Sequence, residues 1–255
     1  YLGSRWSVPK EKEAAGYLGY HYKDKLYLKL GSLFKRAESN TSRGDNDRLW
    51  SLETRVNPTK EIDLNMEYSG SHSSRRGGVF GTAWRINLDG NLFNQIRYSL
   101  DKIYAGPNYY GYYRDSDHTN GAISFRIYRE LRGELFYRSF RENLDLHPAR
   151  GAAPRERAYQ GRVYYSFPTN TRIALDYENL ERKDRLILGD SGSDEQAFRF
   201  GLGQTFRTFS LQTYLEKGRL ENRPLNKTTE LERYSLYAFY VSPDNRQFYN
   251  LYFTT

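Results

Sequence analysis

One short stretch of the chain, residues 61–68, alternates a polar with an apolar residue at every step. Successive side chains of a β-strand point to opposite faces, so Ile62, Leu64, Met66 and Tyr68 share one face and the polar residues share the other. The stretch therefore predicts an amphipathic strand. Which of its faces meets water has to be decided from the rest of the chain.

The same alternation recurs from end to end. We count about fifteen strands without a helical interruption, several of them close to the roughly nine to eleven residues that cross a bilayer when tilted. The predicted strands cover residues 1–8, 18–23, 26–34, 50–56, 61–68, 80–88, 95–101, 123–127, 135–141, 159–167, 172–178, 198–206, 209–216, 234–241 and 248–255.

The connections between these strands alternate in length. Every second one is predicted to be a turn of a few residues, such as the dipeptide Asp89-Gly90, whose residues both tolerate the positive φ of a type I′ hairpin. The connections in between are longer polar loops. A soluble sandwich or propeller has no reason to segregate loop lengths in this way, whereas an up-and-down membrane barrel has short periplasmic turns and longer outer loops.

The composition narrows the classes of protein further. Hydrophobic residues make up 38% and aromatic residues 16%, and the mean hydropathy is −0.86, so the chain is short of the aliphatic residues that a soluble core of this size needs. No run approaches the roughly eighteen apolar residues of a membrane helix. A membrane barrel passes this test, because its alternating faces keep the average polar. The absence of cysteine excludes a disulfide framework and a thiolate metal site.

These features together resemble the outer-membrane β-barrels of Gram-negative bacteria, the porins and related export channels. The resemblance is architectural, spans the whole chain and rests on no motif of a single family. It implies an all-β transmembrane up-and-down antiparallel barrel of about sixteen strands, within a range of roughly 14 to 18, with residues 1–255 as one domain. It further implies an integral outer-membrane location, contact with the lipid bilayer and lipopolysaccharide, and insertion by the barrel-assembly machinery.

The two ends of the sequence fit that pattern unevenly. The start has no initiator Met, basic segment or apolar segment, so we expect that a signal peptide or a longer N-terminal part was removed. Barrels of this kind usually end on an aromatic residue, whereas this chain ends Phe253-Thr254-Thr255. If residues 1–8 are counted as a rising strand, residues 248–255 also rise, so we expect a trimmed chain and a further descending strand after them.

The apolar face of the predicted strands is expected to meet lipid and the polar face a water-filled lumen, since a closed barrel leaves no backbone group unpaired. The alternative for the apolar face is the core of a soluble all-β fold, in which such faces must pack on each other. Aromatic residues lie on the apolar face, several near strand ends, as in the girdles at a membrane interface. They are Tyr20, Tyr22, Trp50, Tyr68, Trp84, Tyr165 and Tyr177.

Charged side chains gather on the face assigned to the lumen, where they would contact solutes and bias which of them pass. The alternative is that they form cross-strand pairs that fix the wall. The net charge of +8 and the excess of arginine favour anionic solutes. The predicted lumen-facing residues are Lys29, Arg55, Arg85, Arg97, Arg126, Arg162, Arg172 and Arg199, with the acids Glu53, Asp63, Asp101, Asp176, Glu178 and Glu216.

The loop 104–120 carries two further features. Its tyrosines, Tyr109, Tyr110, Tyr112 and Tyr113, are a possible constriction loop that folds into the pore or stacks on sugars, and packing over the rim is the alternative. Its sequence 115–118, Asp-Ser-Asp-His, has the residue types of a protease or esterase. Adjacent residues of one loop rarely provide a base in reach of a nucleophile, so we expect a solvated loop.

The sequence therefore predicts a channel that is not an enzyme and passes small polar or anionic solutes through a charged aqueous lumen. One alternative is a polysaccharide export pore whose periplasmic helical-repeat domain is missing from this chain. Another is a structural or surface-anchoring barrel with a filled lumen. No catalytic residue, cofactor or metal site is predicted. Nucleic acid is not an expected partner, because basic and aromatic residues recur along all strands and are not gathered on one element.

Overall fold

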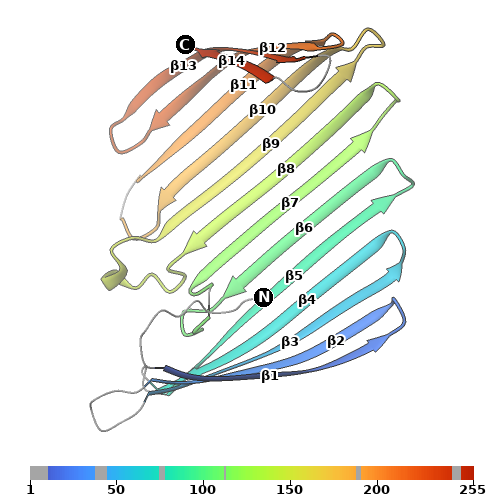
Figure 1. Cartoon of the computed structure of the whole chain (residues 1–255). Helices are drawn as coiled ribbons and strands as arrows, with labels where there is room; N and C mark the ends of the chain where they lie inside the picture. Colours follow the sequence, from blue (N-terminus) through green and yellow to red (C-terminus); the bar gives the residue numbers. More distant parts are fainter. Residues whose placement is uncertain (1–10, 38–44, 75–77, 112, 188–190, 243–247) are drawn as a thin grey trace. The chain divides into compact units, whose positions relative to one another are not determined.

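The computed structural model describes residues 11–37, 45–74, 78–111, 113–187, 191–242 and 248–255. They form one sheet of fourteen strands in which each strand is a neighbour of the next in the chain (Figure 1). The strands are β1 (Glu11–Tyr22), β2 (Leu26–Ala37), β3 (Asp45–Thr59), β4 (Ile62–Ser73), β5 (Val79–Leu92), β6 (Ile96–Ala105), β7 (Ser116–Arg126), β8 (Leu131–Glu142), β9 (Pro154–Ser166), β10 (Thr171–Asp184), β11 (Gly192–Thr205), β12 (Phe209–Asn222), β13 (Lys227–Val241) and β14 (Phe248–Thr254). A short 3-10 turn, η2 (Pro148–Arg150), lies in the connection between β8 and β9.

The all-β, up-and-down antiparallel prediction is confirmed, and the number of strands is fourteen where we expected about sixteen. Fourteen of the predicted strands correspond one to one with β1–β14, and the predicted strand 1–8 lies outside the described residues. Several strands run further than expected, because β12 extends to Asn222 and β13 begins at Lys227. The order begins at β1 and ends at β14, and no pairing of these two is present among the described strands.

The chain divides into two compact units. Unit one comprises residues 1–92, 98–121 and 139–155, and unit two comprises residues 93–97, 122–138 and 156–255. No helix within the described ranges is long and apolar enough to cross a membrane.

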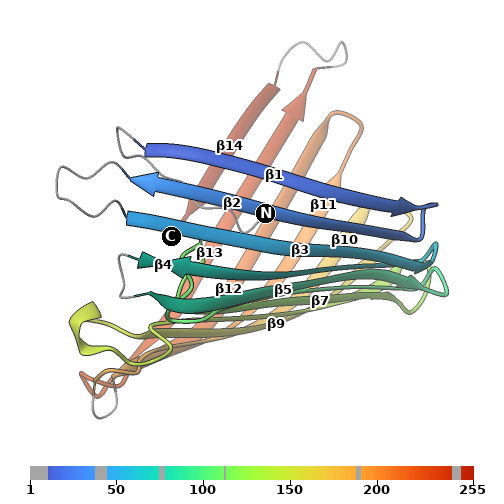
Figure 2. The same cartoon turned by 90° about the horizontal axis from the view of Figure 1, so that it is seen from below.

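Connections at the two ends of the strands differ in length, as predicted. One end, here called the short-turn end, carries the connections 23–25, 60–61, 93–95, 127–130, 167–170, 206–208 and 242–247. The other, the long-loop end, carries 38–44, 74–78, 106–115, 143–153, 185–191 and 223–226. Figure 2 shows the short turns that join β1 to β2 and β3 to β4. The exceptions are 223–226, which is short for its end, and 242–247, which is long for its end.

The turn predicted at Asp89-Gly90 is wrong. Both residues lie inside β5, and the turn falls at 93–95, where Phe93 and Asn94 have φ of 54° and 55°. Gly90 has a different role, because a Cβ there would lie 2.3 Å from ring atoms of Tyr98 on the adjacent strand. The ring of Tyr98 therefore covers this position, and only glycine leaves room for it.

The two faces of the strands differ in what covers them. Side chains on the apolar face are exposed, for example Leu18 (76%), Leu175 (60%) and Phe198 (65%). The hydrophobic cluster of the described residues lies on the opposite, polar face, where Ala83, Ile103 and Ala105 pack with Tyr109. Protein therefore covers part of the polar face of unit one, and the apolar side chains named here remain uncovered.

Candidate functional site

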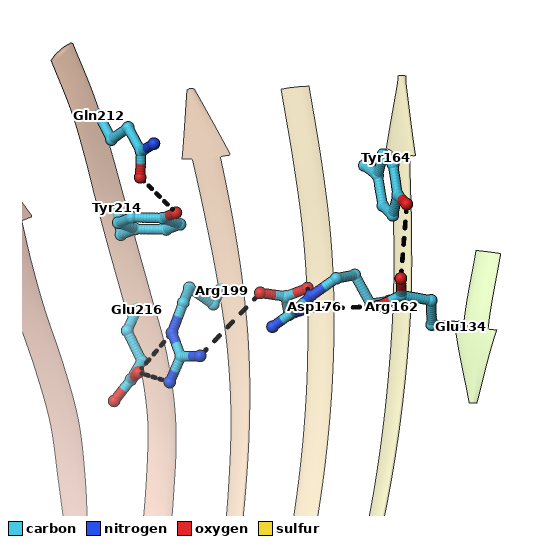
Figure 3. Close-up of polar contacts among 8 residues, drawn as sticks. All are labelled: Glu134, Arg162, Tyr164, Asp176, Arg199, Gln212, Tyr214 and Glu216. Atoms are coloured by element: carbon cyan, nitrogen blue, oxygen red, sulfur yellow. Dashed lines mark hydrogen bonds and ion pairs between the residues drawn. The ribbon is translucent and has the colours of Figure 1, made fainter. Parts of the chain in front are cut away.

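The polar face of unit two carries a row of alternating charges across six strands, here called the charge ladder. Its members are Glu134 (β8), Arg162 (β9), Asp176 (β10), Arg199 (β11), Glu216 (β12) and Arg233 (β13). The last four are direct register partners from strand to strand. Figure 3 shows the first five side by side on consecutive strands. A strand pairing brings directly opposite side chains close together, so the alternation of sign stabilises the face.

The contacts of the ladder are short and continuous. Guanidinium nitrogens of Arg162 lie 3.7 Å from a carboxylate oxygen of Glu134 and 2.5 Å from one of Asp176. Guanidinium nitrogens of Arg199 lie 4.0 Å from a carboxylate oxygen of Asp176 and 2.5 Å from one of Glu216. A guanidinium nitrogen of Arg233 lies 3.3 Å from the other carboxylate oxygen of Glu216. The two central acids, Asp176 and Glu216, are buried although they carry charge. Each of these buried carboxylates contacts two guanidinium groups, which offsets the cost of removing it from water.

Unit one has a similar but less continuous arrangement on its polar face. Lys29 lies 3.6 Å from Glu53 across β2 and β3, and the Arg85 guanidinium donates to Asp101 at 2.8 Å. Arg55 pairs with Asp63. Among the residues that sequence reasoning assigned to the lumen, these pairs and the ladder therefore favour the alternative of a paired wall. Sequence reasoning missed Glu134 and Arg233, whose strands had no clear phase.

Three predicted arginines, and one that was missed, have no acid partner in the described part of the chain. Arg97, Arg126, Arg132 and Arg172 all lie on the polar face at the short-turn end of unit two, and we call them the arginine cluster. The bond from Ile127 N to Leu131 O closes the β7–β8 hairpin, which places Arg126 directly opposite Arg132.

The surroundings of the arginine cluster leave its charge available. The four side chains are exposed, and the guanidinium of Arg172 lies 3.8 Å over the ring of Tyr164. Like charges directly opposite each other destabilise a sheet, and such a cluster is stabilised when an anion binds it. Of the predicted acids, Glu178 on β10 has no ion pair in the described residues.

The predicted constriction loop, here residues 106–115, packs onto the polar face of β4–β6. The Tyr109 side chain is fully buried against Ala83, Ile103 and Ala105. The Tyr110 backbone N–H donates to the Ser71 hydroxyl at 2.8 Å. The Tyr109 ring and the Tyr110 backbone therefore pack against the polar face, whereas packing over the rim was the alternative expected for these tyrosines.

Two further features hold this loop in place. A Cβ on Gly81 of β5 would lie 2.2 Å from the carbonyl carbon of Asn108, so the loop backbone rests directly on the strand. Tyr113 meets the ring of His118 at 5.3 Å between centroids, and His118 in turn meets Phe140 at 4.6 Å. The fourth predicted tyrosine, Tyr112, lies outside the described residues.

Burial also changes the chemistry of the loop. It raises the pKa of the Tyr109 hydroxyl to about 12, and the nearby charge of Glu67 acts in the same direction. The ring therefore stays neutral at every physiological pH. A signal of this packing was present in the sequence, because Ile103 and Ala105 are apolar at positions of the polar phase.

The Asp-Ser-Asp-His sequence does not form a catalytic group. The Asp115 carboxylate accepts from Leu144 N at 2.7 Å and pairs with Arg150 at 2.6 Å, which anchors the loop 143–153. Asp117 and His118 are successive residues of β7 and point to opposite faces. The prediction that this sequence is a solvated loop is wrong, since Asp115, Ser116 and Asp117 are buried.

A cluster that sequence reasoning missed lies on the apolar face at the long-loop end of unit one. The Asp117 carboxylate contacts both Lys102 and Arg141, and Lys102 also lies 2.9 Å from the Thr119 hydroxyl. Asp117 was assigned to a loop, so its side in a strand was not considered. In the ranges that the structure describes, no three acids or histidines gather into a group that could hold a metal ion.

Comparison with known proteins gives no family for this chain. No model of a protein family matches the sequence, and no curated protein matches it.

Proposed function

We propose that the chain forms an integral outer-membrane β-barrel channel for polar and anionic solutes. The observation that carries the proposal is the difference between the two faces, with a charge ladder on one and exposed Leu, Phe and Tyr side chains on the other. An apolar face that no protein covers is stable in hydrocarbon, where it contacts lipid. The polar face then lines an aqueous lumen.

The barrel would close by pairing of β1 with β14. Fourteen is an even number, so in an up-and-down sheet these two strands run antiparallel and can pair directly. An open edge in lipid leaves backbone N–H and C=O groups unsatisfied, at several kcal/mol each. Because the chain has no cysteine, closure can be tested by disulfide crosslinking of single cysteines at Leu18 of β1 with cysteines placed along β14. A crosslink in one register supports closure, and none at any position argues against it.

The arginine cluster would give the channel its preference for anions. A unit charge about 8 Å away in water contributes about 0.5 kcal/mol, so four contribute about 2 kcal/mol before screening. Screening at 0.1 M salt reduces this to about 1 kcal/mol, which corresponds to about a fivefold excess of anions at that mouth. The paired residues of the charge ladder add no net charge, so the ladder would stabilise the wall and leave selection to the cluster.

The test is the ion selectivity of the refolded protein in planar bilayers. Under a KCl gradient, we expect the reversal potential of the wild type to favour chloride. In the variant with all four cluster arginines changed to glutamine, the preference for chloride over potassium should be about fivefold weaker. The matched control is Lys217→Gln/Arg219→Gln, which removes positive charge from the opposite face and should leave the reversal potential unchanged. An unchanged reversal potential in the cluster variant contradicts the role of the arginines.

A second candidate function, an anchoring barrel with a filled lumen, is supported by the loop 106–115, which covers part of the polar face. The same recordings separate the two functions. A barrel that inserts but gives no conductance supports the anchoring function and overturns the channel. In such a barrel, Lys102 and Arg141 on the apolar face would contact anionic headgroups such as those of lipopolysaccharide.

A further inference from the structure

An aromatic surface lies on the polar face of β12–β14, where polar side chains are expected. The ring centroids of Tyr237 and Tyr252 lie 4.7 Å apart, and those of Tyr214 and Tyr237 lie 5.9 Å apart. Phe239 and Phe248 extend the surface with stacked rings 6.5 Å apart. Apart from Tyr214, these rings are exposed, so they are not part of a packed core.

One register row connects this aromatic surface to the arginine cluster. Across β10–β14 the directly paired residues are Arg172, Gly203, Gln212, Tyr237 and Tyr252, and we call them the recognition row. They share the polar face, because residues paired across a sheet lie on the same side of it. At about 4.8 Å between strands the row spans about 19 Å, which is the length of a short oligosaccharide and more than a single small anion needs.

The middle of the row is open. Gly203 has no side chain, and the nearest atom to a Cβ placed there would be 3.6 Å away, on Gln212. The ring of Tyr214 covers the neighbouring Gly201, since a Cβ there would lie 2.8 Å from it. The Tyr214 hydroxyl donates to the Gln212 side chain at 3.2 Å (Figure 3). The row thus offers a cation, a gap, an amide and two rings in sequence.

We propose that the recognition row binds an anionic saccharide, a sugar chain that carries carboxylate or similar groups. Exposed aromatic rings offer flat apolar faces on which the C–H faces of sugar rings can stack. Gln212 and the tyrosine hydroxyls provide partners for sugar hydroxyl groups, and Arg172 provides a planar partner for an acidic group. This inference rests on the proposed function and names the class of solute that the channel would take.

The chemistry of the surface favours a saccharide over a lipid chain. A site for acyl chains needs aliphatic walls without hydrogen-bonding groups, whereas Ser235 and Thr254 lie among these rings and their hydroxyl groups bond to each other at 3.2 Å. The aromatic pair Tyr240 and Tyr249 lies on the opposite face of the same two strands, with centroids 6.1 Å apart. This outer pair is the matched control for the inner one.

The experiment is isothermal titration calorimetry of the refolded protein in detergent micelles. This measurement of binding does not depend on conductance. The probes are an oligogalacturonate and a neutral maltooligosaccharide of the same length. We expect the acidic probe to bind more tightly. Tyr237→Ala should weaken the binding of both probes about fivefold through the lost ring contact. Arg172→Gln should weaken the acidic probe about tenfold and leave the neutral one unchanged, and Tyr240→Ala/Tyr249→Ala should alter neither.

Each outcome has a distinct meaning once the variants show the wild-type resistance to unfolding in SDS. Binding that is absent, or equal for both probes and unaffected by the inner variants, overturns the inference. If the wild type nevertheless conducts with a preference for chloride, the channel function is supported and only the saccharide site is overturned. Binding with the expected variant effects in a protein that gives no conductance supports the recognition row and overturns the channel.

Discussion

Gly81 is the position at which a single added atom should release the loop 106–115. A Cβ there would lie 2.2 Å from the carbonyl carbon of Asn108 and 2.3 Å from the backbone nitrogen of Tyr109. Both neighbours are backbone atoms, so no side-chain rotation can relieve the overlap. Gly81→Ala must therefore displace the loop itself from β5.

The size of the effect follows from the contacts that the docked loop makes. Burial of the Tyr109 ring contributes about 1.5–3 kcal/mol, and the hydrogen bond from Tyr110 N to Ser71 contributes about 1 kcal/mol. Loss of both lowers the free energy of docking by about 3 kcal/mol. The ratio of docked to released loop then falls by about two orders of magnitude.

Limited trypsin digestion measures this release without any assumption about the membrane. Arg114 lies in the loop and is exposed, so the rate of cleavage after it should rise when the loop is free. Cleavage after Arg129, in the hairpin 127–130 of unit two, is the internal reference. Gly203→Ala is the matched control, because its Cβ meets only ordinary contacts, 3.6 Å or longer.

We expect Gly81→Ala to accelerate cleavage after Arg114 by about a hundredfold relative to Arg129, and Gly203→Ala to leave the ratio unchanged. If the loop also narrows the lumen, the single-channel conductance of Gly81→Ala should rise. Equal cleavage ratios in the two variants would refute the docking argument, since the overlap at Gly81 would then have been absorbed without moving the loop.

Three other predictions concern Tyr109, the charge ladder and the two faces of β4. Because burial raises the pKa of Tyr109 to about 12, a released loop ionises near pH 10 and a docked one near pH 12. The free energy of docking should therefore be unaffected below pH 10 and fall by about 2–3 kcal/mol by pH 12. The measurement is the difference in tyrosinate absorbance between the wild type and Tyr109→Phe, which should titrate near pH 12. A titration near pH 10 would contradict the burial of Tyr109. Arg199→Gln leaves two buried carboxylates of the ladder without their shared partner and should lower the free energy of unfolding by about 3 kcal/mol in urea, whereas a loss below about 0.5 kcal/mol would show that the pairs are solvated. Leu64→Lys should cost about 2–4 kcal/mol in lipid vesicles if its face meets the hydrocarbon, and Asp63→Lys, on the opposite face, less than about 1 kcal/mol; equal tolerance at both positions would contradict the barrel.

The fold of this chain was largely predictable because strand alternation is a local property. A side chain changes face with every residue, so the stretch 61–68 by itself predicts β4 and the assignment of its two faces. The alternation of short and long connections then predicts the up-and-down order. The errors fell where local signals conflict, as at Asp89-Gly90, where a preferred turn dipeptide lies inside β5 and pairs with Asp63 and Ile62 of β4.

The candidate site was less predictable, because it depends on partners that are distant in sequence. The alternation of the sequence assigned Arg162, Arg172 and Arg199 to one face, but it could not show which of them has an acidic partner. Register decides that Arg199 faces Asp176 and Glu216 and is neutralised, whereas Arg172 faces Gly203 and keeps its charge available. A shift of one residue would move every side chain of a strand to the other face.

The sequence by itself thus determined the class of fold, the amphipathic strands and the face that carries the charges, because these follow from alternation within each strand. Only the tertiary structure decided which charges pair, that Tyr237 and Tyr252 lie in one register row with Arg172, and that Tyr109 packs onto the polar face. The physical reason is that pairing and packing energies depend on which strands are neighbours and in what register. That information arises only when segments far apart in the chain meet.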